Sequence, residues 1–267
     1  MRSNDLEYKE YTIIDKLEMI PGMFLFRLAG NLKFKPGQFV QAALDHFGEA
    51  TFAPCSDPKE KKFFELCIRS CGSTSNGLIQ LLPGDKIKIR GPYGNGWPIK
   101  KLWWKDALLI AGGMGLVPLR PLLFEIQRER INLGKITLIA GFKSSDHLLF
   151  HYDLLKWRDE LDQVIGIAEY GQKDKWLQHG LITEPLADLK VHPKETTVFV
   201  CGPEVMVPHV NEVLFAKKIP KEQIYISYER RMECGIGICQ HCSIGKFLVC
   251  KDGPIFRYDQ IEQELNK

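Results

Sequence analysis

Four cysteines near the C-terminal end of the chain have the spacing of a metal-binding site. They lie in the stretch MECGIGICQHCSIGKFLVC, residues 232–250, and follow the pattern C-x4-C-x2-C-x7-C. The four residues are Cys234, Cys239, Cys242 and Cys250. The first three match plant-type [2Fe–2S] spacing, in which a fourth cysteine follows further along the chain. Gly235 and Gly237 would let the backbone curl around a compact anionic cluster and direct N–H groups at its sulfides.

Other chemistries remain open for these thiols. Four cysteines, or three with one histidine, can hold a structural zinc ion, and His241 lies inside the loop. Zinc sites usually present two separated C-x2-C pairs, and this segment has one. Disulfides would need an oxidising compartment. The N-terminal stretch MRSNDLEYKEYT is polar and unlike a secretory signal, so we expect a cytoplasmic protein with reduced thiols.

The composition is that of an ordinary globular protein. Of 267 residues, 45% are hydrophobic and 26% are charged, which is enough for one large domain or two with an appendage. The formal net charge is only +3 and no run of like charges occurs, so nothing points to nucleic acid or a lipid surface. No apolar stretch reaches the roughly 18 residues of a membrane-spanning helix.

The pattern of predicted secondary structure changes near residue 103. Residues 1–102 contain short apolar or alternating runs bounded by Gly, Pro, Asp or Asn, which predict an antiparallel barrel. The runs are YTIIDKLEMI, MFLFRLAG, GQFVQAAL, KFFELCIRS and DKIKIRGPYG. In residues 103–227, strands such as ALLIAGG and KITLIAGF alternate with helices expected over 118–134, 147–161 and 204–217. This alternation predicts a doubly wound parallel sheet. Residues 228–267 hold the cysteines and are expected to carry little regular structure.

Two segments of the second region suggest nucleotide binding. The segment IAGGMGLVPLRPL, residues 110–122, follows a buried strand and opens a helix, as a phosphate-binding turn does. The segment FVCGPEVM, residues 199–206, also follows a strand, at the end where parallel sheets bind ligands. The candidates are Gly112, Gly113, Met114, Gly115, Cys201, Gly202, Pro203 and Met206. The alternatives are a tight strand-to-helix turn and a buried structural cysteine.

Two segments of the first region combine small hydroxyl residues with turns. APCS spans residues 53–56 and IRSCGSTSNG spans residues 68–77. Their backbone and hydroxyl donors suit a pyrophosphate, although each can also be a hydroxyl-rich surface turn. The candidate binding residues are Ala53, Pro54, Cys55, Ser56, Ile68, Arg69, Gly72, Ser73, Thr74 and Ser75.

The order of barrel, nucleotide domain and cysteine cluster resembles the ferredoxin–NADP reductase superfamily. Within it, the chain is similar over its whole length to iron–sulfur flavoprotein subunits. These are the gamma subunit of cytosolic NiFe hydrogenases or sulfhydrogenases, the B subunit of anaerobic sulfite reductase, and the electron-transfer subunit of dihydroorotate dehydrogenase. The resemblance rests on FKPGQFV, GPYGNGWP, YERRMECGIGICQHC and VCKDGPIFRY, besides the segments above. The x7 spacer favours the first two branches, because that spacer is usually longer in the third.

The resemblance implies an FAD-binding barrel (1–102), an NAD(P)-binding domain (103–227) and a [2Fe–2S] module (228–267). Hydride transfer from NAD(P)H to FAD would be followed by one-electron transfer to the cluster and then to a partner subunit, or the reverse. Cys201 would stand at the nicotinamide–flavin contact as the catalytic residue. The family has Arg and Tyr where this chain has Ala53 and Cys55, and Arg69 is the candidate replacement for that charge.

Nothing in the sequence resembles a site for nickel, siroheme or orotate, so we expect a hetero-oligomer with a separate catalytic subunit. The partner favoured by the resemblance is a NiFe hydrogenase core. The alternatives are the sulfite reductase and dihydroorotate dehydrogenase subunits, a free-standing NAD(P)H diaphorase, and a zinc-binding scaffold. Lys143 and Ser144 could favour a 2′-phosphate and hence NADPH, or belong to an exposed loop.

Overall fold

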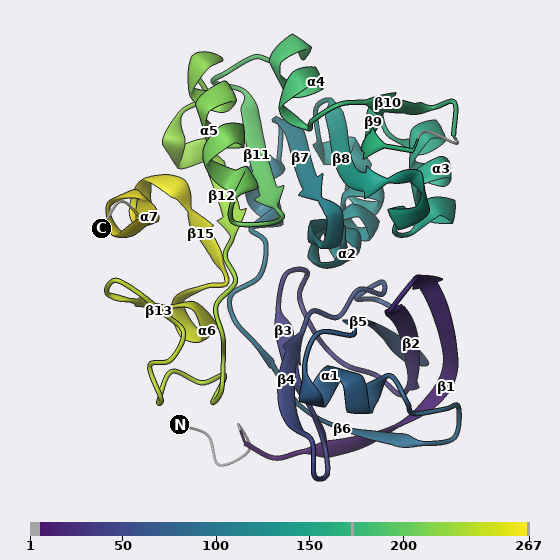
Figure 1. Ribbon diagram of the computed structural model, residues 1–267. Helices are drawn as coiled ribbons and strands as arrows, with labels where there is room; N and C mark the ends of the chain where they lie inside the picture. Colours follow the sequence, from purple (N-terminus) through teal and green to yellow (C-terminus); the bar gives the residue numbers. More distant parts are fainter. Residues whose placement is uncertain (1–5, 172–173, 266–267) are drawn as a thin grey trace. The chain divides into compact units, whose positions relative to one another are not determined.

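The computed structural model describes residues 6–171 and 174–265, and these divide into two compact units (Figure 1). The first unit contains the described residues up to Trp97 together with Arg120–Phe124 and Glu229–Ile255. The second unit contains Pro98–Leu119, Glu125–Tyr228 and the described residues from Phe256 onward. The exact domain boundaries expected from the sequence stay a prediction.

The first unit is built on an antiparallel sheet with the strand order β4-β3-β6-β1-β2-β5. Its strands are β1 (Lys9–Ile20), β2 (Met23–Ala29), β3 (Phe39–Leu44), β4 (Gly48–Phe52), β5 (Phe63–Arg69) and β6 (Lys86–Tyr93), with helix α1 (Ser73–Leu78). A bridge between Pro54 and Leu66 links the continuation of β4 to β5. The predicted antiparallel fold is confirmed and is barrel-like, although the pairing of the described strands does not close into a full barrel.

Side-chain alternation along these strands builds the core of the first unit. On β3, Val40 and Ala42 are fully buried in a cluster that also contains Phe26 and Leu66. Gln41, between them, points to the opposite face because successive strand residues alternate. The same face of the sheet carries Arg90 of β6, which is the cross-strand neighbour of Gln41 on β3. This outer face becomes important for the cysteine loop.

The sequence did not predict β4. Its five residues, GEATF, have no fully buried position and begin with a glycine at φ +86°, where the β3–β4 hairpin turns. A short edge strand that is only half-buried has little apolar alternation to reveal it, whereas tertiary pairing with β3 defines it clearly.

The second unit contains a sheet with the strand order β10-β9-β8-β7-β11-β12-β15, in which the pairs from β10 to β12 are parallel. Its strands are β7 (Asp106–Gly112), β8 (Ile136–Ser144), β9 (Gln163–Tyr170), β10 (Leu177–His179), β11 (Thr196–Cys201), β12 (Ile224–Ser227) and β15 (Ile255–Arg257). The helices that connect or follow them are α2 (Leu116–Arg128), α3 (His151–Glu160), α4 (Thr183–Asp188), α5 (Met206–Ala216) and α7 (Tyr258–Leu265). The predicted doubly wound sheet is confirmed.

The prediction of little regular structure after residue 228 was wrong. β15 extends the parallel sheet beside β12, and α7 follows it directly. Helix α7 buries Tyr258 and Ile261, and the Tyr258 ring lies 5.4 Å from the ring of Phe215 on α5. Three residues of strand and two turns of helix are too short to show a period in sequence, so packing onto α5 decides this structure.

The intervening segment, which carries the cysteines, contains the two-residue strands β13 (Ser243–Ile244) and β14 (Phe247–Leu248), followed by α6 (Val249–Asp252). The predicted helices are also shorter than expected, because α2 ends at Arg128 and a 3-10 turn over Arg130–Asn132 follows it. In the described part of the chain, no helix has both the length and the apolar character required to cross a bilayer.

Candidate functional site

The two predicted nucleotide segments meet at the carboxyl ends of neighbouring strands. β7 and β11 run side by side, with Ala111 opposite Cys201. The chain passes from β7 to β8 on one side and from β11 to β12 on the other, so the strand order reverses between them. Open parallel sheets bind ligands at such a switch point. The structure therefore brings Gly112–Gly115 and Cys201–Met206 to the edge where a dinucleotide would bind.

Close backbone packing explains the glycines of these segments. A Cβ at Gly115 would lie 1.9 Å from the carbonyl oxygen of Cys201. A Cβ at Gly112 would lie 2.5 Å from Sδ of Met206, and one at Gly202 would lie 2.5 Å from Cε of the same methionine. Side chains at these positions would force the two turns apart. Gly113 differs, since its Cβ would meet open space while its φ is +51°.

Cys201 ends β11 and is 2% exposed. Its carbonyl contacts the Gly115 position, so its backbone joins the two turns. The catalytic role of Cys201 stays a prediction, because the contacts described for this residue involve its backbone and not a nicotinamide or a flavin.

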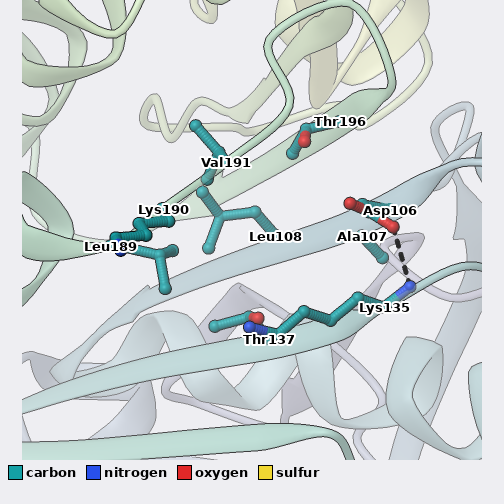
Figure 2. A pocket seen from close by; sticks show the side chains of 9 residues that line it. All are labelled: Asp106, Ala107, Leu108, Lys135, Thr137, Leu189, Lys190, Val191 and Thr196. Carbon is teal, nitrogen blue, oxygen red and sulfur yellow. Dashed lines mark hydrogen bonds between the residues drawn. The ribbon is translucent and has the colours of Figure 1, made fainter.

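A small pocket lies at the opposite, amino-terminal edge of the same sheet (Figure 2). It is lined by Asp106, Ala107, Leu108, Lys135, Thr137, Leu189, Lys190, Val191 and Thr196. Asp106 and Thr196 are the first residues of β7 and β11, and Asp106 Oδ1 accepts a 2.8 Å hydrogen bond from the backbone N–H of Lys135. Because doubly wound sheets bind nucleotides at the other edge, this pocket is not assigned to a cofactor.

In the first unit, the segment 53–56 continues from β4 and is anchored to β5. The backbone N–H of Cys55 donates to the carbonyl of Glu65 at 2.9 Å, and the Ser56 hydroxyl accepts from the N–H of Glu65 at 3.1 Å. The Cys55 thiol is fully buried and burial raises its pKa well above the usual value, so it is a neutral packing group. Ala53 is half-buried and Pro54 is buried.

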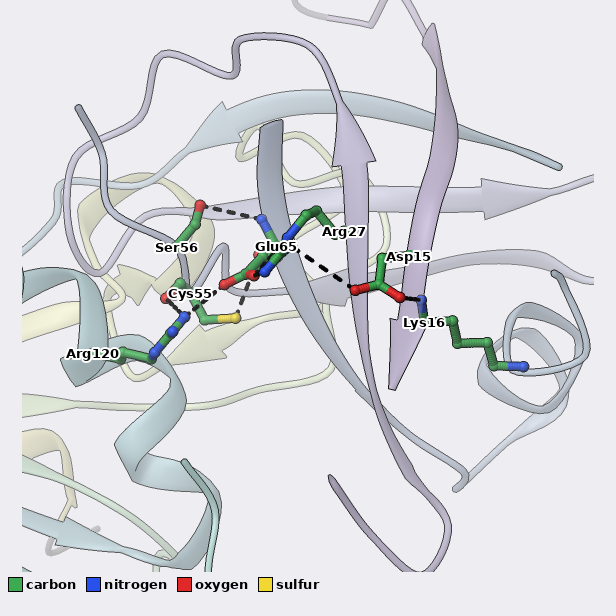
Figure 3. A network of polar contacts seen from close by, with 7 residues as sticks. All are labelled: Asp15, Lys16, Arg27, Cys55, Ser56, Glu65 and Arg120. Atoms are coloured by element: carbon green, nitrogen blue, oxygen red, sulfur yellow. Dashed lines mark hydrogen bonds and ion pairs between the residues drawn. The ribbon is translucent and has the colours of Figure 1, made fainter. Parts of the chain in front are cut away.

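A buried charge network, which the sequence analysis missed, holds this segment (Figure 3). The Arg120 guanidinium donates at 2.7 Å both to the Cys55 carbonyl and to Oε2 of Glu65. Arg27 donates to the other carboxylate oxygen of Glu65 at 2.8 Å. Glu65 is 3% exposed, so both cations satisfy a carboxylate that water scarcely reaches. A single glutamate within the apolar run FFELCIR was the available signal.

Replacing Arg120 with methionine is expected to destabilise the protein by about 3 kcal/mol, because Glu65 would keep a buried charge with one partner instead of two. Arg128→Met on the same helix is the matched control. Its guanidinium is 36% exposed and 3.8 Å from Glu125, so its loss should change stability by at most about 0.5 kcal/mol. Urea unfolding of both variants measures the difference, and equal midpoints would contradict this role of Arg120.

The predicted pyrophosphate loop forms the turn into α1. The Ser75 hydroxyl accepts from the N–H groups of Cys71 and Gly72 at 3.0 and 2.9 Å, and the Thr74 hydroxyl donates to the Phe47 carbonyl at 2.7 Å. Both hydroxyls therefore shape the loop, which leaves its backbone and Ser73 as the groups open to a ligand. Ile68 is buried in the core and Arg69 is exposed at the end of β5.

The four C-terminal cysteines lie in one segment, with backbone N–H groups directed at the sulfurs of Cys234, Cys242 and Cys250. The N–H of Gly237 donates to Cys250 Sγ at 3.1 Å, and that of Ile238 donates to Cys234 Sγ at 3.3 Å. The N–H of Cys250 lies 3.4 Å from Cys242 Sγ. None of the described cysteines is in a disulfide, and the described residues contain no group of three or more His, Cys, Asp or Glu side chains already placed around one point.

The thiols form two pairs with different electrostatics. Burial disfavours the Cys234 thiolate, but N–H groups of Cys239, Ile236 and Ile238 outweigh it and lower the pKa of Cys234 to about 6. Burial, together with the neighbouring Cys242 thiol, raises the pKa of Cys250 to about 12. Backbone donors aimed at sulfur, with the thiols in two pairs of one segment, suit an anionic cluster that shares its charge over several sulfurs.

Arg90, also missed in the sequence, fastens this loop to the barrel sheet. Its Nη1 donates to the Cys234 carbonyl at 2.6 Å and its Nη2 to the Glu233 carbonyl at 3.0 Å. The other Nη2 hydrogen bond goes to Glu49 at 2.6 Å, and the guanidinium is 4% exposed. Burial disfavours its charge, but hydrogen bonds to Glu49 and Tyr93 keep the pKa of Arg90 above its usual value.

Comparison with known proteins agrees with this arrangement. Three family models match the chain: the oxidoreductase FAD-binding domain over residues 19–97, the oxidoreductase NAD-binding domain over 109–212, and the iron–sulfur cluster binding domain of dihydroorotate dehydrogenase B over 229–262. The gamma subunit of sulfhydrogenase 1 from Pyrococcus furiosus is 40% identical over 253 residues, covering 90% of this chain and 86% of that protein. The chain belongs to this family of iron–sulfur flavoprotein electron-transfer subunits.

One further relative supports the family assignment, and one solved structure shows the fold. A probable electron-transfer subunit of dihydroorotate dehydrogenase B from Thermococcus kodakarensis is 32% identical, with 95% of this chain and 98% of that protein covered. A chain in the structure of NADH-dependent reduced ferredoxin–NADP oxidoreductase has a TM-score of 0.76 at 22% identity, covering 96% and 92% of the two chains. The latter shows the same fold.

As a member of this family, the protein is an NAD(P)H-dependent oxidoreductase that uses FAD and an iron–sulfur cluster. The residues described above fit these groups. The cysteine loop offers four thiols, three of which accept backbone N–H groups, and the glycine turns of β7 and β11 lie without side chains at the nucleotide-binding edge. The departure at Ala53 and Cys55 leaves the flavin segment without the arginine and tyrosine of the wider superfamily.

Proposed function

We propose that the chain is the NAD(P)H-oxidising or NAD(P)+-reducing subunit of a hydrogenase of the sulfhydrogenase type. The observation that carries this proposal is the 40% identity to a sulfhydrogenase gamma subunit across 90% of the chain. The designation of that relative as a gamma subunit indicates a hetero-oligomer, so a separate catalytic chain would hold the hydrogen-activating centre. A cytoplasmic location, where thiols stay reduced, is part of this proposal.

Each group would be held by residues already described. The turns 112–115 and 201–206 would bind the dinucleotide, with Cys201 at the nicotinamide. The segments 53–56 and 68–75 would bind FAD. Cys234, Cys239, Cys242 and Cys250 would hold a [2Fe–2S] cluster. The flavin supplies the conversion between hydride and single electrons, while the protein binds and orients the groups and excludes competing reactions.

The cysteine loop has a buried side and an exposed side. Cys242 and Cys250 are 1% and 2% exposed, whereas Cys239 and its neighbour Ile238 face solvent. Ile238 is 58% exposed, so an apolar side chain stands beside the exposed Cys239. We place the exit of electrons to the catalytic subunit at this exposed edge.

A second candidate is the electron-transfer subunit of dihydroorotate dehydrogenase. The match of residues 229–262 to the iron–sulfur domain of that enzyme and the 32% identity to the Thermococcus protein favour it. The two candidates share every cofactor in this chain and differ in the partner. The partner's substrate therefore separates them.

The test is an anaerobic titration of the purified protein with NADH or NADPH, followed by visible and EPR spectroscopy. We expect the flavin absorbance to bleach and a rhombic reduced [2Fe–2S] signal to appear with at least one nucleotide. The complex purified through a tag on this chain should then reduce NAD(P)+ with hydrogen. Reduction by dihydroorotate instead would establish the second candidate, and a colourless zinc protein would overturn both.

A further inference from the structure

A buried amide beside the cysteine loop lacks the partners that such a group requires. Gln41 on β3 is 0% exposed, yet neither its Nε2 nor its Oε1 has a hydrogen-bond partner among the described residues. The hydroxyl of Thr51, which lies opposite Gln41 on β4, is also buried and without a partner there. Each such group costs about 1–3 kcal/mol when left unsatisfied, so three polar atoms at one place indicate a bound group.

The strand register defines where these groups point. Val40 and Ala42 belong to the barrel core, so Gln41 faces the outer side of the sheet. Thr51 and Arg90 are its cross-strand partners and share this face. The row Thr51–Gln41–Arg90 therefore runs across β4, β3 and β6 on the side to which Arg90 fastens the cysteine loop.

Gln41 lies directly against that loop. A Cβ built on Gly235, the residue after Cys234, would be 3.5 Å from Cγ of Gln41 and 3.3 Å from the ring of Tyr93. Gly235 has a φ of +71° and is buried, so the backbone at this point presses onto the Gln41 side chain. The amide beyond Cγ thus sits where the first cysteine of the cluster motif meets the barrel.

We propose that the Gln41 amide donates a hydrogen bond to a sulfur of the bound iron–sulfur cluster. The inference rests on the assignment of the four cysteines as cluster ligands. An amide N–H suits a sulfide or thiolate acceptor, and hydrogen bonds to cluster sulfurs are a recognised means of tuning the reduction potential. Reduction adds negative charge to the cluster, so the donor stabilises the reduced state more than the oxidised state and raises the potential.

The experiment compares Gln41→Leu with the unaltered protein in redox titrations that follow the cluster by EPR and the flavin by absorbance. Loss of the donor is expected to make cluster reduction about tenfold less favourable, which is 59 mV for a one-electron couple, with altered g-values. The flavin potential and the iron content should stay unchanged.

Gln38→Leu is the matched control, because the Gln38 amide already accepts from the Lys35 N–H and donates to the Gly94 carbonyl. Its cluster potential should equal that of the unaltered protein. If Gln41→Leu fails to assemble a cluster, Gln41→Glu keeps the shape and, when ionised, removes the donor, so its potential must also fall. An unchanged cluster potential, or a shift confined to the flavin, would overturn the inference. The EPR signal itself reports separately whether the cysteines hold a cluster.

Discussion

Cys250→Ala is expected to abolish the iron–sulfur centre while leaving the flavin bound. Cys250 is 2% exposed, its sulfur accepts the Gly237 N–H, and its own N–H points at Cys242. No other thiol in the loop can replace it, since the other three are the remaining ligands of the motif. Iron per flavin should fall at least about tenfold, with the EPR signal lost, because a four-cysteine cluster tolerates no open position at this buried edge.

The effect of Cys250→Ala on activity should depend on the electron acceptor. NAD(P)H should still bleach the flavin of Cys250→Ala and reduce a two-electron dye, because the nucleotide and flavin segments lie outside the loop. Reduction of the catalytic partner, or hydrogen-dependent NAD(P)+ reduction by the complex, should disappear. Stopped-flow absorbance measures the first step and a hydrogen-uptake assay measures the second.

His241→Ala is the control within the same loop. The His241 side chain is 48% exposed and its Nε2 lies 3.6 Å from Glu233, so it is directed at a surface carboxylate. Its loss should leave iron content and the EPR signal intact. A protein that loses its metal through His241→Ala and contains zinc would instead have a three-cysteine, one-histidine site, contrary to the cluster assignment.

The cofactor-binding motifs of this molecule were easier to predict from the sequence than the structure that surrounds them. Ligand spacing is a local property, so C-x4-C-x2-C-x7-C could be recognised without knowing the fold. The glycine turns after β7 and β11 could likewise be placed at strand ends by the alternation of strands and helices. The two turns come together because the sheet order places β7 beside β11. That order follows from the rules for parallel crossover connections and not from the sequence of either turn.

The groups that surround the cluster loop could not be predicted in this way. Arg90 and Gln41 belong to strands more than 140 residues from Cys234, and only the register of β3 on β6 places them together. From the sequence alone, Arg90 would be expected to be one of the solvent-facing polar residues of an alternating strand. Glu65 shows the same limit, because its partner Arg120 lies in a helix and their pairing depends on packing alone.

Gly115→Ala is expected to remove NAD(P)H binding and to lower the free energy of unfolding by about 3 kcal/mol. The new methyl group would stand 1.9 Å from the Cys201 carbonyl oxygen and 2.8 Å from the Gly202 nitrogen, which are backbone atoms that cannot rotate away. The φ of Gly115 is −60°, a value that alanine adopts freely, so the effect is purely steric. Urea unfolding and equilibrium dialysis with NADH and NADPH measure both quantities.

Gly113→Asn is the control that shows whether any substitution in this turn destabilises the protein, or only one that creates a clash. Its Cβ meets nothing within 4 Å and asparagine tolerates a φ of +51°, so the unfolding free energy should change by at most about 1 kcal/mol. Dithionite should still reduce the flavin and cluster of Gly115→Ala if only the nucleotide edge is disturbed. Because the two turns must touch to form that edge, reduction of Gly115→Ala by NAD(P)H at the unaltered rate would show that the dinucleotide binds elsewhere.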